Sequence, residues 1–343
     1  MTWNSGKPTF NPMAMNYKEN KPALRLLESA DDSFFLDCID EFYRTIEKDP
    51  GFAVTRKISS SGRLKPWLIR KLTDFSFLYR LRLRLGNKKA VNFASMISGD
   101  YRIIVPAAFF SRQNYIYMYD VWPRFQRWIF PLLDVFNITY VFFSSKQVYE
   151  DYLRKSPANK CKAMWLPEAL NADEYAFKPV GERTIDVLEF GRNYESYHNL
   201  ITGQLKLHGK KHLFKLPGQP VLFEGKPAFT EALSQSKIVI CIPSDITHPD
   251  RAEYISTMTL RYLQAMASKC LIVGIMPSDM EETFGYVPIV EIDMDNAAQQ
   301  IIDVLDNYAA YLPLIEKNYQ EVKAKHQWKN RWAVIRQKME ENL

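Results

Sequence analysis

Short apolar runs that alternate with helix-like segments constrain the fold of this chain more than any other feature. Continuous apolar runs are typical of parallel strands buried on both faces, and helices between them indicate βα units. The first series has strand-like runs at 90–97, 102–110, 115–120, 138–145 and 161–167, with helices near 123–136 and 146–154. The second has runs at 185–191, 211–217, 237–244, 270–277 and 287–293, with helices near 195–207 and 227–235. The pattern predicts an α/β protein with two Rossmann-like, doubly wound domains that face each other across a cleft.

The polar stretch 171–184 separates the two series and contains Pro179 and Gly181. We therefore place a first domain at 1–175 and a second at 180–325, followed by an amphipathic helix at 326–343. The length of 343 residues allows each domain a core of its own.

Composition excludes several classes of protein. The chain is 47% hydrophobic and 24% charged, as in soluble globular proteins, and no window approaches 18 consecutive apolar residues. The first 20 residues lack the layout of a signal peptide. The four cysteines lie far apart and the five histidines are scattered, so we expect no metal site, no disulfide framework and no cofactor, and a cytoplasmic location.

Positive charge is concentrated in one segment. Residues 56–89 hold eleven basic residues and one acid, while the whole chain has a formal net charge of +6. Aromatic and aliphatic residues are interleaved with these charges, which favours an anionic membrane surface at the inner face of the membrane, although an acidic polymer or a solvated helix face would fit as well. We expect no nucleic-acid partner, because the chain contains no recognised nucleic-acid module and its remainder is acidic.

The stretch 254–274 begins with more hydroxyl groups than helix capping needs. Ser256, Thr257 and Thr259 precede a helix that carries Arg261 and Gln264, between two apolar strands. If Ser256 or Thr257 is the N-cap, the free N–H groups of the first turn form an anion site, with Thr257, Arg261 and Gln264 along one stripe. The alternative is a capped helix with a solvated polar face.

A second junction follows the strand at 185–191. Gly191 would allow close approach of the backbone to a ligand, and Arg192, Tyr194 and His198 come next. Arginine suits bidentate contact with phosphate. Arg192 could instead pair with a nearby glutamate.

The end of the strand at 115–120 offers a carboxylate. Asp120 could act as a general base or bind a sugar hydroxyl, or it could cap the helix that starts at Pro123. Trp122 would line the cleft beside it. Arg112 and Arg124 could neutralise phosphate or be surface charges. In the first domain Glu168, at the strand end "WLPEALN", could also face the cleft.

These motifs together resemble the GT-B-fold glycosyltransferases, in particular the group 1 clan and its CgeB-like relatives. The resemblance is carried by "IDVLEFGR", "ALSQSKIVICIPS", "STMTLRYLQAMASKCLIVG" and a late "WKNRW". The resemblance is moderate over residues 185–335 and weak over residues 90–180.

The resemblance implies a metal-independent hexosyltransferase with a nucleotide-diphosphate sugar in the second domain and an acceptor in the first. Arg192 would contact the diphosphate, and Ser256, Thr257 and Thr259 would hold phosphate or ribose. The last helix, 326–343, would pack back on the first domain. The acceptor would be a glycan or a lipid-linked saccharide of cell-surface polysaccharide synthesis.

The sequence departs from the clan pattern at three positions, one of which is Lys269, where relatives usually have glycine. Many relatives have glutamates where this chain has Ser256 and Gln264, and an amide can hydrogen-bond to hydroxyls but carries no charge. Two alternatives follow: a non-catalytic binding or scaffold protein on the same fold, and a nucleotide-sugar 2-epimerase, which would need several carboxylates and histidines in the cleft.

Overall fold

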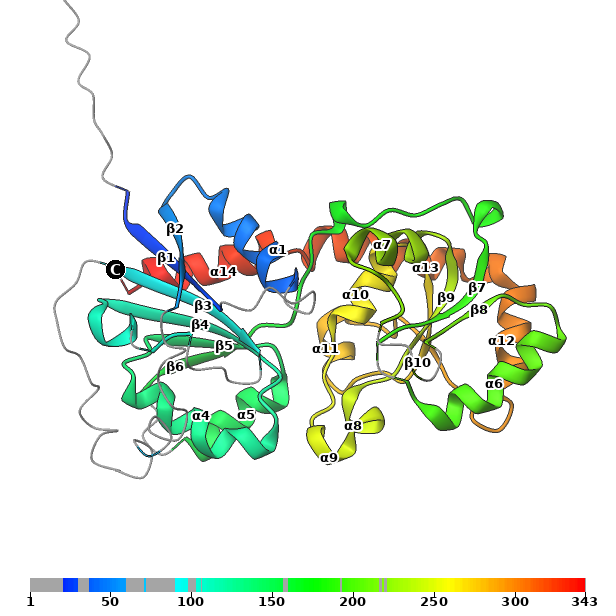
Figure 1. Cartoon of the computed structure of the whole chain (residues 1–343), viewed down its shortest axis with the longest axis horizontal. Helices are drawn as coiled ribbons and strands as arrows, with labels where there is room; N and C mark the ends of the chain where they lie inside the picture. Colours follow the sequence, from blue (N-terminus) through cyan, green and yellow to red (C-terminus); the bar gives the residue numbers. More distant parts are fainter. Residues whose placement is uncertain are drawn as a thin grey trace, which may run out of the picture.

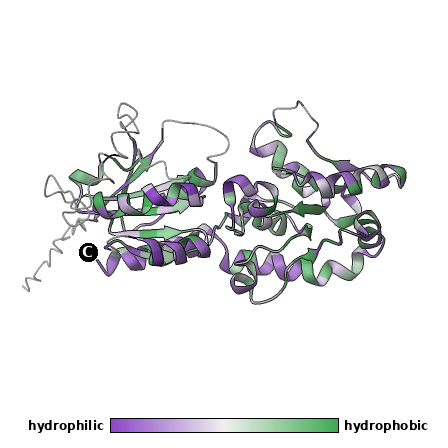
Figure 2. Cartoon of the chain, turned by 90° about the horizontal axis from the view of Figure 1, so that it is seen from below, coloured by the Kyte–Doolittle hydropathy of each residue, from purple (hydrophilic) through white to green (hydrophobic). Residues whose placement is uncertain are grey.

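The computed structural model describes residues 21–29, 37–59, 71, 90–97, 103–105, 107–156, 160–191, 193–215, 218 and 221–342. They form two α/β domains side by side, which confirms the predicted fold class (Figure 1). Figure 2 shows hydrophobic strands inside each domain, with hydrophilic residues on the outer faces of the helices.

The first domain contains a six-stranded parallel sheet in the order β2-β1-β3-β4-β5-β6. Its strands are β1 (Ala23–Glu28), β2 (Ala53–Ile58), β3 (Val91–Ile97), β4 (Gln113–Tyr119), β5 (Tyr140–Phe143) and β6 (Lys162–Trp165). Its helices are α1 (Asp37–Glu47), η4 (Ala107–Phe110), α4 (Pro123–Val135) and α5 (Lys146–Lys155). The direction of winding reverses between β1 and β3, where doubly wound sheets bind ligands at the carboxyl ends of their strands.

Strand β4 explains how the first domain is layered. Its side chains alternate between faces, as they must in a strand. Tyr115, Tyr117 and Tyr119 pack with α1 and α14 (Trp328–Glu340), whereas Ile116 and Met118 pack with α4 and α5. The sheet is thus covered by helices on both faces, and each face buries a separate core.

The second domain repeats this plan with a five-stranded parallel sheet, β11-β10-β9-β7-β8, which reverses between β7 and β9. Its strands are β7 (Ile185–Glu189), β8 (His212–Leu213), β9 (Ser236–Cys241), β10 (Leu271–Gly274) and β11 (Val290–Glu291). One face packs with α7 (Lys226–Ser234), α10 (Leu260–Ala267), α11 (Met280–Phe284) and α13 (Leu312–Lys325). The other packs with α6 (Glu195–Leu207) and α12 (Ala297–Asp306). Shorter elements are α8 (Ser244–Thr247), α9 (Pro249–Ala252), η5 (Ala172–Glu174), η6 (Val180–Glu182) and η7 (Tyr308–Tyr311).

The chain crosses between the domains twice, and the two crossings pair with each other. Leu170 and Gln327 form a parallel bridge. Buried Arg331 of α14 donates to the carbonyl oxygens of Pro167, at 2.6 Å, and Lys325, at 3.0 Å. Helix α14 then packs on the first domain, where the Trp328 ring stacks on Phe42 with 4.3 Å between centroids.

Several local predictions differ from the structure. Residues 102–110 were expected to form a strand, but 103–105 are a turn and η4 follows, since these side chains pack in the core against one face of the sheet and the segment does not pair with a strand. Strands β1 and β2 were not predicted. Helix α10 begins at Leu260, so Thr259 is the N-cap rather than Ser256 or Thr257. Among the described residues no helix is long and apolar enough to cross a membrane.

Candidate functional site

A cavity of about 660 Å³ lies between the two domains. It is lined by the carboxyl ends of β3, β4 and β7, by the starts of α1, α7 and α10, and by Trp328 of α14. Both sheets therefore direct the ends of their strands into one space, where the reversal of winding in each sheet leaves room for a ligand.

The charges that line this cavity are sorted by domain. Among the described residues, the acidic lining groups all come from the first domain and the crossing that leaves it; we call them the acidic wall: Asp37, Glu41, Asp120 and Glu168. The basic groups all come from the second domain; we call them the basic wall: Lys215, Lys226, His248, Arg251 and Arg261. A ligand in the cavity therefore meets negative charge on one side and positive charge on the other.

Arg261 is held in place beneath Gly191. Its guanidinium donates to the carbonyl oxygen of Ile242, with Nη2 and O 2.8 Å apart, and the residue is 9% exposed. Gly191 has a φ of +75°, and a Cβ there would lie 3.1 Å from Cδ of Arg261. Glycine is required on both counts, because backbone conformation and the packing of Arg261 each disfavour a side chain.

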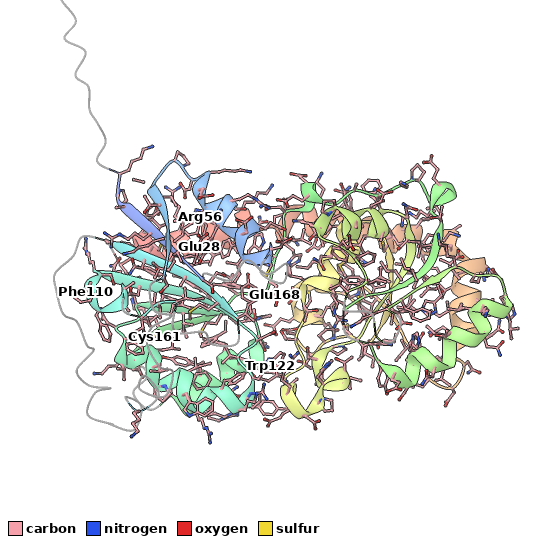
Figure 3. The ribbon with its side chains drawn as sticks, viewed as in Figure 1. Glu28, Arg56, Phe110, Trp122, Cys161 and Glu168 are labelled. Atoms are coloured by element: carbon pink, nitrogen blue, oxygen red, sulfur yellow. The ribbon has the colours of Figure 1, made fainter. Side chains whose placement is uncertain are left out.

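Carboxylates occupy part of the start of α10. Glu168, which is buried at the junction of the domains (Figure 3), accepts from the N–H of Leu260 at 2.8 Å. Asp279 accepts from the hydroxyl of Thr257 at 2.6 Å and from the N–H of Met258 at 2.8 Å. Burial raises the pKa of Asp279, while these hydrogen bonds oppose the rise. The positive end of this helix thus already attracts anionic groups.

Thr259 is the hydroxyl of this stretch that lines the cavity. It occupies the N-cap position of α10 without capping it. Its buried Oγ1 has no hydrogen-bond partner among the described residues. A buried hydroxyl of this kind is costly to leave unpaired.

Asp120 lies where β4 ends and lines the cavity, as the sequence placed it. Its φ of +50° is uncommon for a residue with a side chain. The strand therefore turns sharply at this carboxylate, immediately before Trp122 and α4. Such strained positions cluster at functional sites.

Lys226 joins the two walls directly. Its Nζ lies 2.8 Å from Oε2 of Glu41 and also pairs with Glu174. Burial alone would lower the pKa of Lys226, but Glu41 and Glu174 raise it above its ordinary value. Burial raises the pKa of Glu41, and Lys226 opposes that rise. This ion pair spans the cleft at the edge of the cavity.

Five predicted site residues line the cavity: Asp120, Glu168, Thr259, Arg261 and Gln264. Gln264 donates to the hydroxyl of Tyr175 at 3.1 Å, so its amide is oriented by the interdomain crossing. The functional roles of these residues stay predictions.

Other predicted site residues lie elsewhere in the described structure. Ser256 accepts from the hydroxyl of Ser278 through its carbonyl oxygen, and Thr257 is turned toward Asp279. Tyr194 packs against the α6–α12 core. Arg112 precedes β4, at the amino end of the strand and away from the cavity, and Arg124 lies exposed over the ring of Phe125.

Trp122 is buried in the first-domain core, and Arg251 lies over its ring at 5.2 Å. Arg192 lies outside the described residues, as does most of the basic segment 56–89. Of that segment, Arg56 forms ion pairs with Glu28, Asp40 and Glu47.

Sequence reasoning missed four members of the basic wall: Lys215, Lys226, His248 and Arg251. The signal for two of them was present, because "DITHPDR" directly follows the end of β9, at the ligand-binding edge of a parallel sheet. Lys226 had a weaker signal as the first residue of α7. A cation at a helix N-terminus is unfavourable for the helix dipole, which indicates that another interaction favours lysine at this position.

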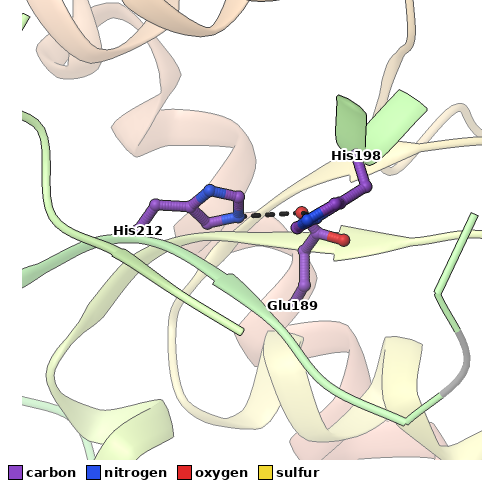
Figure 4. A group of neighbouring side chains, drawn as sticks. All are labelled: Glu189, His198 and His212. Carbon is purple, nitrogen blue, oxygen red and sulfur yellow. Dashed lines mark hydrogen bonds and ion pairs between the residues drawn. The ribbon is translucent and has the colours of Figure 1, made fainter. Parts of the chain in front are cut away.

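His198 belongs to a separate cluster with Glu189 and His212 (Figure 4). Both imidazoles contact Oε1 of Glu189, at 2.9 Å and 2.8 Å. These hydrogen bonds lower the pKa of Glu189 against the rise that burial would cause, and the contact with Glu189 raises the pKa of His198. This is the one group of three or more potential metal ligands that the described residues bring together.

Comparison with known proteins finds likeness only in structure. No protein-family model and no curated protein matches the sequence. Among solved structures, sucrose-phosphate synthase from Thermosynechococcus elongatus matches with a TM-score of 0.58 and 13% identity, over 94% of this chain and 100% of that one. A glycosyltransferase from Rickettsia africae matches with a TM-score of 0.56 and 11% identity, over 92% and 97%.

HepE from Anabaena, solved in complex with UDP and glucose, matches with a TM-score of 0.55 and 11% identity, over 92% of this chain and 99% of that one. The likeness to these proteins extends over both domains. The chain therefore has the GT-B fold, with two Rossmann-like domains facing a central cleft.

Proposed function

We propose that this protein is a glycosyltransferase that moves a sugar from a nucleotide-diphosphate donor to an acceptor hydroxyl in the interdomain cavity. The observation that carries the proposal is the sorting of charge between the two walls. A diphosphate leaving group needs positive charge, whereas an acceptor hydroxyl needs a proton acceptor. HepE was solved with UDP and glucose, which supports the same class of donor here.

The donor diphosphate would lie against the basic wall. Arg261 would stabilise the charge that develops on the leaving phosphate, and it is already fixed by its hydrogen bond to Ile242. Thr259 would donate its unpartnered hydroxyl to a phosphate or ribose oxygen. Gly191 would let the diphosphate approach the backbone closely. Gln264 would bind donor hydroxyls as a neutral hydrogen-bonding group.

The acceptor would lie against the acidic wall. Asp120 would accept the proton from the attacking hydroxyl, because its carboxylate stands at the end of β4 inside the cavity. The bond between the anomeric carbon and the donor phosphate breaks as the new glycosidic bond forms, and the diphosphate leaves with the electron pair. The lysines and arginines of the basic wall would supply the charge stabilisation in the cleft, so we propose metal-independent transfer.

The acceptor would be a glycan or a lipid-linked saccharide in cell-surface polysaccharide synthesis. The support is the basic segment 56–89, whose charge suits an anionic membrane surface facing the cytoplasm. Flotation with anionic liposomes tests this part. Binding at low salt that is lost at high salt is expected, and no binding at low salt would contradict it.

A thermal-shift screen against UDP-, GDP-, ADP- and CDP-sugars tests the donor. A bound ligand raises the unfolding temperature by an amount that grows with the logarithm of its concentration relative to its Kd. We expect one nucleotide series to stabilise the protein, with the free diphosphate retaining most of the effect. Absence of binding to any nucleoside diphosphate, checked by calorimetry, would favour a non-catalytic scaffold instead.

A further inference from the structure

Three side chains from three separate elements converge on one point of the second domain. Glu189 ends β7, His198 lies in the second turn of α6, and His212 begins the edge strand β8. Their candidate ligand atoms all lie within 4.8 Å of one another (Figure 4). Residues so distant in sequence meet here because parallel pairing places Val187 beside His212 and because α6 packs back on β7.

The spacing of the donor atoms is close to that of a tetrahedral metal site. Zinc bonds of about 2.0–2.1 Å place neighbouring ligand atoms about 3.3 Å apart. In this structure Oε1 of Glu189 lies 2.9 Å from Nδ1 of His198 and 2.8 Å from Nε2 of His212. A small outward shift of the side chains would therefore admit a cation in place of the two hydrogen-bonded protons.

The surroundings of the cluster suit a bound cation. The side chains of Glu189 and His212 are 8% and 5% exposed, and that of His198 is 14% exposed. The Phe214 ring packs against both imidazoles, at 4.6 Å and 4.7 Å between centroids. Nδ1 of His212 is buried and has no partner among the described residues, so the ring is oriented by its contact with Glu189 through Nε2. A hydrophobic shell of this kind excludes water and strengthens metal–ligand bonds.

We propose that Glu189, His198 and His212 form a binding site for a divalent transition metal, with zinc as the best fit. Two imidazole nitrogens and one carboxylate favour zinc over magnesium or calcium, which prefer oxygen ligands. A water molecule completes the tetrahedron. None of the three residues is among those that line the cavity, so the metal would not take part in the transfer step.

The bound metal would fix the wall of the cavity that adjoins it. Phe190 and Gly191 directly follow Glu189, and Lys215 comes three residues after His212. Strand β8 has only two residues and lies at the edge of its sheet, so backbone pairing alone holds it weakly. Metal bonds from β8 to β7 and α6 would hold Gly191 and Lys215 in position.

Metal binding to the purified, full-length protein tests the proposal directly. The protein is stripped with a chelator and titrated with zinc in a competing-chelator buffer, alongside Glu189→Gln, His198→Ala and His212→Ala variants. His208→Ala is the matched control, since His208 is an exposed histidine at the end of the same helix. We expect wild type and the control to bind one equivalent, and each ligand variant to lose affinity by more than the roughly 10- to 100-fold typical of an outer-shell loss.

Cobalt substitution of wild type keeps the test decisive if a variant fails to fold. A tetrahedral cobalt spectrum, together with zinc-dependent thermal stabilisation, is the expected result. Wild type that binds no zinc, or affinity that falls equally in His208→Ala, would overturn the proposal. Donor binding is measured separately, so failure of the metal site leaves the proposed transferase activity standing.

Discussion

The two walls of the cavity differ in charge and in how the sequence builds them. The basic wall draws three of its members, His248, Arg251 and Arg261, from one stretch between β9 and β10. The acidic wall contains residues from α1, from the end of β4 and from the interdomain crossing. Its first and last members are more than a hundred positions apart in the sequence. Most of the basic wall therefore comes from one local stretch of sequence, whereas the acidic wall exists only once the fold has formed.

The largest effect is expected on the acidic wall, at Asp120. Asp120→Asn keeps the size of the side chain but removes the proton acceptor. We expect kcat to fall by roughly 10²- to 10⁴-fold, as is usual when a general base is lost, with donor affinity unchanged. Steady-state kinetics on the identified donor and calorimetry with its nucleoside diphosphate measure the two quantities.

Asp37→Asn serves as the control for Asp120, because Asp37 lines the same wall from α1. Its activity should stay close to that of wild type. Equal loss in both variants would show that the acidic wall acts through its total charge and not through one base.

Arg261 should give the next largest effect, on donor binding as well as on turnover. Arg261→Gln removes a charged donor, and hydrogen bonds to charged groups contribute about 1.5–3 kcal/mol. The Kd of the nucleoside diphosphate should rise roughly 10- to 100-fold. Arg112→Gln is the control, since Arg112 lies at the opposite end of β4. An unchanged Kd in Arg261→Gln would remove this residue from the donor site.

The sequence was enough to predict the architecture. Buried parallel strands are continuous apolar runs, so most strands of both sheets could be read directly. Strands β1 and β2 were missed because their composition is mixed: Arg25 and Lys57 lie at exposed positions, and Arg56 is half-buried. Residues 102–110 gave a wrong strand prediction for the opposite reason. Their apolar side chains pack in a core although the segment does not pair with the sheet.

The site could be predicted only in part. Strand-end position correctly brought Asp120 and Glu168 to the cavity, because parallel strands end at one edge, and Arg261 reaches it from the start of α10. Ser256 and Thr257 offer the same hydroxyl chemistry as Thr259, and the start of α10 decides which of these residues lines the cavity. The meeting of Glu189 with His212 depends on the pairing of β7 with β8, which spacing along the chain does not reveal.

The two paired chain crossings between the domains should make the stability of the protein depend on pH. His326 is 4% exposed, its Nδ1 accepts from Arg331 at 2.9 Å, and burial followed by Arg331 lowers its pKa from 6.5 to about 3. The unfolded chain binds this proton more readily than the folded one. Its contribution to stability is therefore complete above about pH 6.5 and is lost as the pH falls toward 3, by roughly 1 kcal/mol per pH unit.

Denaturant unfolding of wild type and His326→Gln between about pH 7 and pH 5 measures this contribution. The wild-type free energy of unfolding should fall more steeply with acidification than that of the variant. Parallel curves for the two proteins would show that His326 is not the titrating group.

The smallest effect is expected at Glu168, and it should have the opposite sign to that at Arg261. Glu168 brings negative charge to the start of α10, where its carboxylate accepts from the N–H of Leu260. Glu168→Gln keeps an acceptor oxygen but removes repulsion of a diphosphate, worth about 1 kcal/mol for charges near 4 Å apart in water. Donor Kd should therefore fall about fivefold, while unfolding temperature drops slightly because a favourable charge at a helix N-terminus is lost. Weaker donor binding in this variant would instead show that Glu168 contacts donor hydroxyls directly. The division of the cavity into an acidic wall that faces the acceptor and a basic wall that faces the donor would then be wrong at this residue.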